Sequence, residues 1–149
     1  MSDEINRGPV ADPDLAEILG RDLRRRVPEA LVSMLEPGER ALVVVDGVPG
    51  AIVATDRRVL VERWLHPTVA FRYDELTGAI AHVGIFSKRY VALTGPGLQS
   101  SFGFGMQGRS NNATVVQIWR MGQAKSAATD ITKIVNAINA GARGKIEQP

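Results

Sequence analysis

The sequence has no cysteine and only two histidines among its 149 residues. The absence of cysteine excludes a disulfide framework, a thiolate nucleophile and a cysteine-based zinc site. Neither His66 nor His82 shows the close His, Asp or Glu spacing of a metal site or an acid–base pair. No nucleophile elbow of the Gly-x-Ser-x-Gly type and no Walker loop occurs. We therefore expect a protein that is not an enzyme and binds no metal.

A cofactor site is not expected either, although one glycine-rich segment matches a cofactor-binding motif. Residues 103–108, Gly-Phe-Gly-Met-Gln-Gly, match the dinucleotide-binding fingerprint. That fingerprint works only where a helix starts at its end and directs amide dipoles at a pyrophosphate. Residues 109–112, Arg-Ser-Asn-Asn, begin a turn instead. We therefore predict no cofactor.

The chain also lacks a long apolar run. Residues 1–10 carry charges where a signal peptide would need an apolar stretch. The longest uncharged stretch, Tyr90 to Gly108, is long enough to cross a membrane. Its glycine, proline, serine and glutamine residues would leave polar groups in hydrocarbon, so strands joined by turns fit better. A reducing environment suits a chain without cysteine, and we expect the cytoplasm.

The composition is that of one ordinary globular domain. Apolar residues make up 44% and charged residues 23% of the chain, and a chain of this length forms a single core. The 18 basic and 16 acidic residues leave a net charge of +2, which neither demands nor excludes an acidic partner.

Helical patterns lie at both ends of the chain. Asp12 before Pro13 is a helix-start signal, and apolar residues follow at three-to-four spacing until Pro28 interrupts the run. We expect one kinked helix or two short helices within residues 12–35, after a flexible N-terminus at 1–11. A second helix is expected at 125–142, ended by Gly141 and Gly144 and followed by a flexible tail at 143–149. Its apolar stripe should pack against the β-domain, which leaves Asp130, Lys133 and Asn136 on its solvent-exposed face.

Between the helices, β-branched runs alternate with turn signals, as in an antiparallel β-domain. We expect about seven strands, drawn from the segments 41–45, 51–55, 58–64, 69–73, 79–85, 90–94, 99–104 and 114–119. At the turn between the second and third, we expect Asp56 to bond the downstream backbone while Arg57 and Arg58 stay solvated. The fold class predicted from the residues is α+β, mainly β.

Three short motifs resemble those of bacterial pleckstrin-homology-like and GRAM-like domains. Residues 35–40, Leu-Glu-Pro-Gly-Glu-Arg, resemble the entry to the first strand of that family. Residues 54–60 resemble its Thr-Asp-x-Arg-Leu turn, and residues 71–76 resemble its Tyr-Asp-x-Leu step. The resemblance implies a small antiparallel barrel at 36–142 with a C-terminal capping helix, to which residues 12–35 are an addition.

Two arginine groups are candidates for contact with an anionic surface. Arg24 and Arg25 lie in the densest basic cluster, where nearby carboxylates dilute the charge. The other group lies in two turns and comprises Arg57, Arg58, Lys88 and Arg89. An anionic membrane surface is therefore a possible partner. Nucleic acid is an unlikely one, because the charge is balanced and no stacking pattern is present.

The uncharged tract is the candidate for contact with another protein. Strand pleating prevents all its large apolar residues from pointing inward; these are Phe102, Phe104, Val115 and Trp119. Either a partner or the N-terminal helical segment should cover them. We therefore expect a binding module that engages a protein partner or a second copy of itself, with peripheral membrane binding as the alternative.

Overall fold

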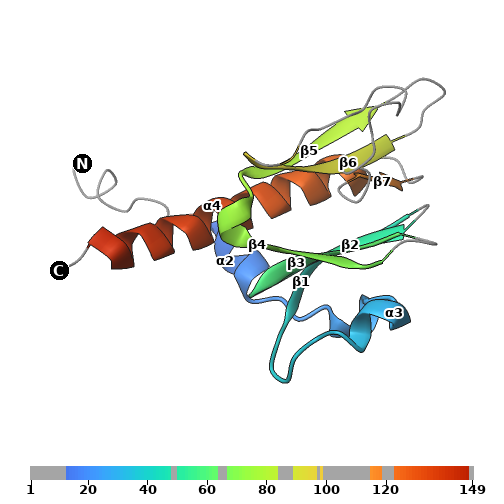
Figure 1. Ribbon diagram of the computed structural model, residues 1–149, viewed down its shortest axis with the longest axis horizontal. Helices are drawn as coiled ribbons and strands as arrows, with labels where there is room; N and C mark the ends of the chain where they lie inside the picture. Colours follow the sequence, from blue (N-terminus) through green and yellow to red (C-terminus); the bar gives the residue numbers. More distant parts are fainter. Residues whose placement is uncertain are drawn as a thin grey trace.

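The computed structural model describes residues 13–47, 50–63, 67–83, 89–96, 98, 115–118 and 123–147. Two antiparallel sheets and a long C-terminal helix make up an α+β fold (Figure 1). The strands of the first sheet are β1 (Ala41–Asp46), β2 (Gly50–Thr55), β3 (Arg58–Arg63) and β4 (Val69–Arg72). The second sheet contains β5 (Gly78–Val83), β6 (Arg89–Thr94) and β7 (Val115–Ile118). The strands follow one another in chain order within each sheet, which is the order that short turns between neighbouring strands produce.

The predicted strands agree with these bounds to within a few residues, with two corrections. Tyr73 does not end β4 but starts a short 3-10 helix, η3 (Tyr73–Glu75), which connects the two sheets. The expected closed barrel is not formed by the described strands, because their pairing stops at the boundary between the sheets. The predicted strand at 99–104 lies outside the described residues.

The N-terminal segment packs against both faces of the first sheet. It comprises α2 (Pro13–Leu19), the 3-10 turn η2 (Arg24–Arg26) and α3 (Glu29–Val32). Ile18 joins the main core, whereas Val27, Leu31 and Leu35 form a second core on the other face, over Val53 and Leu60. The apolar residues of the predicted helical segment are therefore divided between two cores. The helix ends before Gly20, and the chain then follows the edge of β1, where the Leu23 amide donates to the Ala41 carbonyl over 2.7 Å.

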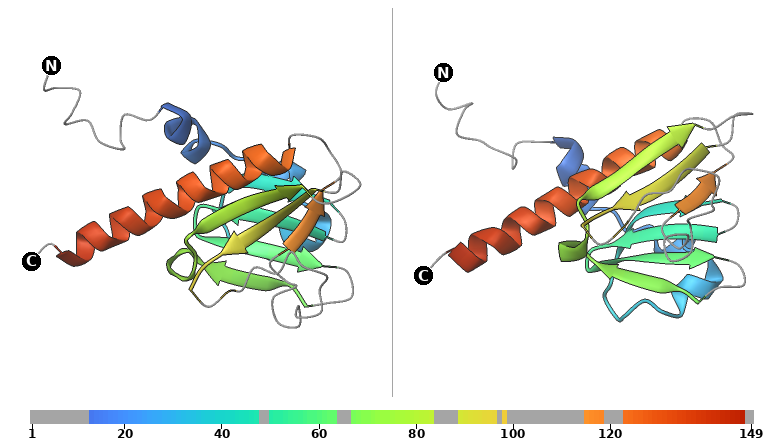
Figure 2. Two further views of the ribbon diagram at one scale, coloured as in Figure 1. Left: turned by 90° about the horizontal axis from the view of Figure 1, so that it is seen from above. Right: turned by 45° about the horizontal axis from the view of Figure 1, so that its top comes forward.

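The C-terminal helix α4 (Gln123–Glu147) packs against β5, β6 and β1 (Figure 2). The predicted apolar stripe on it is confirmed, because each of its members is buried or packed against the main core: Ala127, Ala128, Ile131, Ile134, Val135 and Ile138. The prediction that Gly141 and Gly144 end the helix is wrong, since α4 continues through both to Glu147. Glycine lowers helix stability by about 1 kcal/mol relative to alanine, which an otherwise favourable helix tolerates.

Candidate functional site

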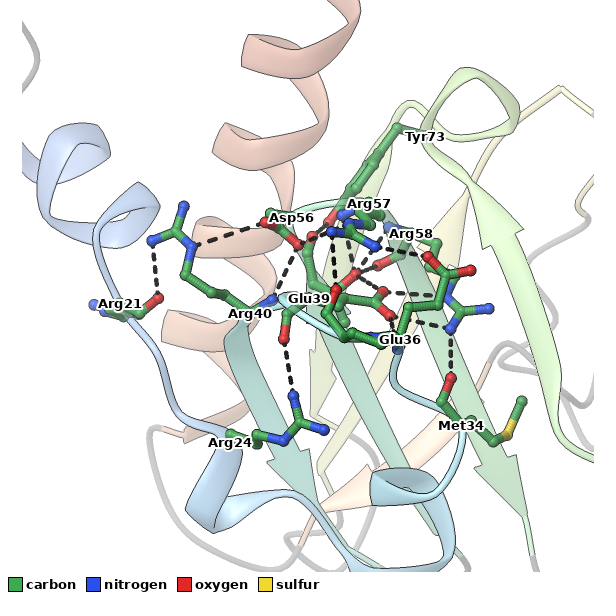
Figure 3. A network of polar contacts seen from close by, with 12 residues as sticks. Arg21, Arg24, Met34, Glu36, Glu39, Arg40, Asp56, Arg57, Arg58 and Tyr73 are labelled. Carbon is green, nitrogen blue, oxygen red and sulfur yellow. Dashed lines mark hydrogen bonds and ion pairs between the residues drawn. The ribbon is translucent and has the colours of Figure 1, made fainter.

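A buried carboxylate, Glu39, organises the polar groups at one end of the first sheet (Figure 3). Its Oε1 atom accepts hydrogen bonds from the Glu36 amide at 2.9 Å and from Arg58 Nη2 at 3.1 Å. Its Oε2 atom accepts from the Thr55 hydroxyl at 2.6 Å and from Arg58 Nε at 3.1 Å. The carboxylate is thus fully engaged by groups of the chain, and this geometry serves the structure rather than a ligand.

The protonation state of Glu39 follows from these bonds. Burial raises the pKa of its carboxyl, but the hydrogen bonds from Arg58, Glu36 and Thr55 outweigh burial and hold the pKa below its usual value. The same pair raises the pKa of the Arg58 guanidinium, because the hydrogen bond to Glu39 favours its charged form. Both groups are charged at neutral pH and form a hydrogen-bonded ion pair, in which Glu39 is buried and Arg58 is partly buried.

Tyr73 lies at the same end of the sheet and is buried. Its hydroxyl donates a hydrogen bond to the Thr55 carbonyl oxygen. Burial is the main reason that the pKa of this hydroxyl is raised, and the charges of Asp56 and Glu39 raise it further. Tyr73 therefore acts as a neutral donor that connects η3 to the end of β2.

Of the arginines predicted to contact an anionic surface, the structure brings three together at this cluster. Arg24 donates to the Glu39 carbonyl oxygen over 3.4 Å. Arg57 pairs with Glu36 at 2.7 Å, with 44% of the Arg57 side chain exposed. The prediction that Arg58 stays solvated is wrong, because it pairs with buried Glu39 and donates to the Met34 carbonyl oxygen over 2.6 Å. Asp56 also differs from expectation, since it accepts from the upstream Arg40 amide, and Thr55 bonds the downstream amides instead.

The other predicted cations lie elsewhere or outside the described chain. Arg25 is exposed on η2. Arg89 begins β6 on the second sheet and is half-buried, so it does not join the cluster around Glu39. Lys88 lies outside the described residues. The structure therefore does not gather the six predicted cations at one end of the fold.

Strand β5 of the second sheet carries an exposed apolar side chain. Among the described residues, Ile80 is the one large apolar side chain that is exposed, with 43% of its surface accessible. Ala79 pairs with Leu93 and faces the main core, so Ile80 and His82 face outward on the opposite side of the strand. The ring of Tyr90 lies beside that of His82, with centroids 6.3 Å apart. We call Ile80, His82 and Tyr90 the outer patch.

Of the four residues predicted for a protein interface, the structure describes Val115. It begins β7 and pairs with Ala92, which pairs in turn with Ile80. Phe102, Phe104 and Trp119 lie outside the described residues. The signal for the outer patch was present in the sequence: residues 78–83, Gly-Ala-Ile-Ala-His-Val, alternate small residues with Ile80 and His82.

An open groove of about 420 Å³ separates α2 from α4. Its lining is mostly charged and hydroxylic, with one apolar residue at its base: Asp14, Glu17, Ile18, Arg21, Lys125, Ser126, Thr129, Asp130 and Lys133. Asp130 and Lys133, predicted to be solvated, instead pair with Arg21 and Asp14 of the N-terminal segment. This groove mixes charges of both signs and selects no single class of ligand.

Within the described part of the chain, no three His, Cys, Asp or Glu side chains are grouped to hold a metal ion. None of the helices formed by these residues has the length and apolarity to cross a bilayer. In comparisons with protein-family models, curated proteins and solved structures, none matches this chain.

Proposed function

We propose that this protein is a non-catalytic binding module with a pleckstrin-homology-like fold, which acts through protein contacts or self-assembly. The exposure of Ile80 on an edge strand is the observation that carries the proposal. Protein recognition commonly uses an exposed apolar anchor beside aromatic groups, and a free sheet edge can accept a further strand. The outer patch supplies such an anchor, and among the described strands β5 has a neighbour on one side only.

The pleckstrin-homology-like part of the proposal is supported by where the three sequence motifs meet. Glu39 belongs to the first motif, Thr55 and Arg58 to the second, and Tyr73 to the third. These residues contact one another in the cluster around Glu39. The motifs are distant in sequence yet share one hydrogen-bond network, which is the behaviour of residues that specify one fold.

The test compares two charge substitutions on exposed edge-strand residues. Ile80→Glu places a carboxylate in the outer patch, and Ala70→Glu is the matched control on β4 of the other sheet. Each purified variant and the wild type are examined for self-association by sedimentation over a range of concentrations, and for partners retained from a lysate of the native cells.

We expect the wild type and Ala70→Glu to share an oligomer or a retained partner that Ile80→Glu loses. The proposal fails if the wild type stays monomeric and retains nothing. It fails equally if Ile80→Glu behaves as the wild type does, because binding would then not use the outer patch.

A second candidate is peripheral binding to an anionic membrane. Arg25 and its neighbour Arg26 are exposed, and neither is paired with a carboxylate in the part of the chain that is described. Flotation with anionic vesicles at low and physiological salt tests this function. The double variant Arg25→Gln/Arg26→Gln should then lose flotation, while the equally discharged Arg72→Gln/Lys125→Gln keeps it. No flotation of the wild type excludes this candidate.

A further inference from the structure

Residues 13–22, which we call the latch segment, contact α4 through one buried side chain and two ion pairs. Ile18 is almost completely buried in the main core. Arg21 Nη1 lies 3.1 Å from Asp130 Oδ2, and Lys133 Nζ lies 3.4 Å from Asp14 Oδ2. Figure 2 shows α2 beside the middle of α4. Leu19 is partly buried and also packs against the main core. The contact therefore depends on apolar packing and on charge.

The packing between the latch segment and α4 is incomplete. The groove of about 420 Å³ lies between them, and among the described side chains of α2 only Ile18 is buried. A helix of seven residues is too short to be stable by itself in water. The helical form of α2 consequently depends on its contact with α4.

Both ion pairs are accessible to solvent, so salt weakens them. The side chains of Arg21 and Asp130 are 29% and 24% exposed, and that of Asp14 is 75% exposed. Attraction between exposed charges is screened by mobile ions, whereas the bond of Arg58 to Glu39, whose own side chain is fully buried, is screened less. The contact of the latch segment with α4 is therefore sensitive to ionic strength.

The chain is anchored again just after the latch segment. The Leu23 amide bonds to the Ala41 carbonyl, and Val27 belongs to the second core. Within the latch segment, Arg21 also bonds the chain at β1: its Nη1 donates to the Leu42 carbonyl oxygen over 3.4 Å, and its carbonyl oxygen accepts from Arg40 Nη1 at 3.3 Å. Opening of residues 13–22 must therefore break these two bonds as well, while the rest of the N-terminal segment stays in place.

We propose that the latch segment is a reversible cover on α4: it opens as a unit when its ion pairs with Asp130 and Lys133 are screened or displaced, and its opening uncovers apolar surface of α4 and β1. This inference is independent of the outer patch, which lies on β5 and β6. Local opening of this kind is expected for elements with few buried contacts, at a free energy below that of global unfolding.

The absence of cysteine from the chain allows a direct test by thiol labelling. Ile18→Cys places a thiol under the latch segment, and Val53→Cys places one in the central strand β2, where the side chain is fully buried. A thiol reagent reacts with each only when its site opens. We expect the thiol at position 18 to react at least about tenfold faster than that at position 53. Its labelling rate should increase further as salt is added.

Asp130→Asn in the Ile18→Cys background should accelerate labelling in low salt and reduce its salt dependence, because one ion pair is already lost. Asp74→Asn is the matched control, since it discharges an exposed carboxylate that pairs with Arg72 at 3.0 Å. Equal labelling rates at positions 18 and 53 at every salt concentration would overturn the proposal. The proposal would also be overturned if neither salt nor Asp130→Asn changed the labelling rate at position 18.

Discussion

The hydroxyl of Thr132, in the middle of α4, closes the outer edge of β5 at Ala79. It accepts a hydrogen bond from the Ala79 amide at 3.0 Å, and it lies 3.0 Å from the Ala79 carbonyl oxygen. A helix side chain therefore takes the position that a neighbouring strand would occupy. Gly78 permits this approach, because it has a φ of +153° and a Cβ there would lie 2.8 Å from the Thr132 hydroxyl. The outer edge of β5 is therefore already occupied at Ala79.

Replacing this hydroxyl should destabilise the fold. Thr132→Val keeps the shape of the side chain but leaves the Ala79 amide without its partner, and we expect a loss of about 1–3 kcal/mol in the free energy of unfolding. Thr129→Val is the matched control, because Thr129 is exposed on the same helix; its effect should stay within about 0.5 kcal/mol. Urea unfolding measures both. Equal losses would show that the contact with Ala79 contributes nothing.

Loss of Arg58 should strongly destabilise the protein at neutral pH, because Arg58 is the counter-ion of buried Glu39. Arg58→Met leaves a buried carboxylate without its counter-ion, at a cost of about 3–5 kcal/mol. Arg57→Met is the matched control: its pair with Glu36 is largely exposed and contributes about 0–1 kcal/mol. Urea unfolding of the two variants at pH 7 should separate them clearly, and similar losses would contradict a structural role for the buried pair.

The cost of Arg58→Met should shrink in acid. In the wild type the pKa of Glu39 is lowered, so its contribution to stability is present above the usual carboxyl range and is lost as pH falls through the folded-state pKa. Without Arg58, burial dominates and raises the pKa of Glu39. Protonation of Glu39 in mild acid then removes the unpaired buried charge and restores part of the variant's stability. Urea unfolding between pH 7 and about pH 4 measures the difference in the free energy of unfolding between the wild type and Arg58→Met. A difference that stays constant over this range would contradict this account.

Much of the fold could be predicted because its signals are local. β-Branched runs between turn signals located β1 to β7 to within a few residues, and the stripe from Ala127 to Ile138 identified the buried face of α4. The limits of α2 were less predictable: the apolar spacing continues past Gly20, and nothing local shows that Ile18 and Val27 belong to different cores.

Which arginines are solvated and which are paired could not be predicted, because pairing depends on carboxylates distant in sequence. Arg57 and Arg58 are adjacent and look alike in the sequence, yet Arg57 pairs with exposed Glu36 and Arg58 pairs with buried Glu39. The outer patch was missed for a different reason. The longest uncharged tract, residues 90–108, begins with Tyr90 of the outer patch but does not include the short strand that carries Ile80 and His82.

Two glycines with different surroundings should respond oppositely to alanine. At Gly50, in β2, a Cβ would overlap the Glu62 carbonyl group of β3, so Gly50→Ala should reduce stability by more than about 4 kcal/mol or prevent folding. At Gly141, within α4, a Cβ would meet nothing within 4 Å. Gly141→Ala should therefore stabilise the protein by about 0.5–1 kcal/mol. Thermal and urea unfolding test both, and destabilisation by Gly141→Ala would contradict the continuous helix.

Tyr73 should control how the fold responds to alkali. Because its pKa is raised in the folded state, its contribution is fully present below the unfolded-state pKa of about 10 and is lost as pH rises above it. Tyr73→Phe removes the bond to Thr55 and should cost about 1–2 kcal/mol at pH 7. The variant lacks the ionisable group, so its stability should fall less between pH 8 and about pH 11, and the gap to the wild type should narrow. Tyr90→Phe, which retains Tyr73, should keep the steeper decline of the wild type; a decline of the same slope in Tyr73→Phe would show that another group causes the alkaline loss.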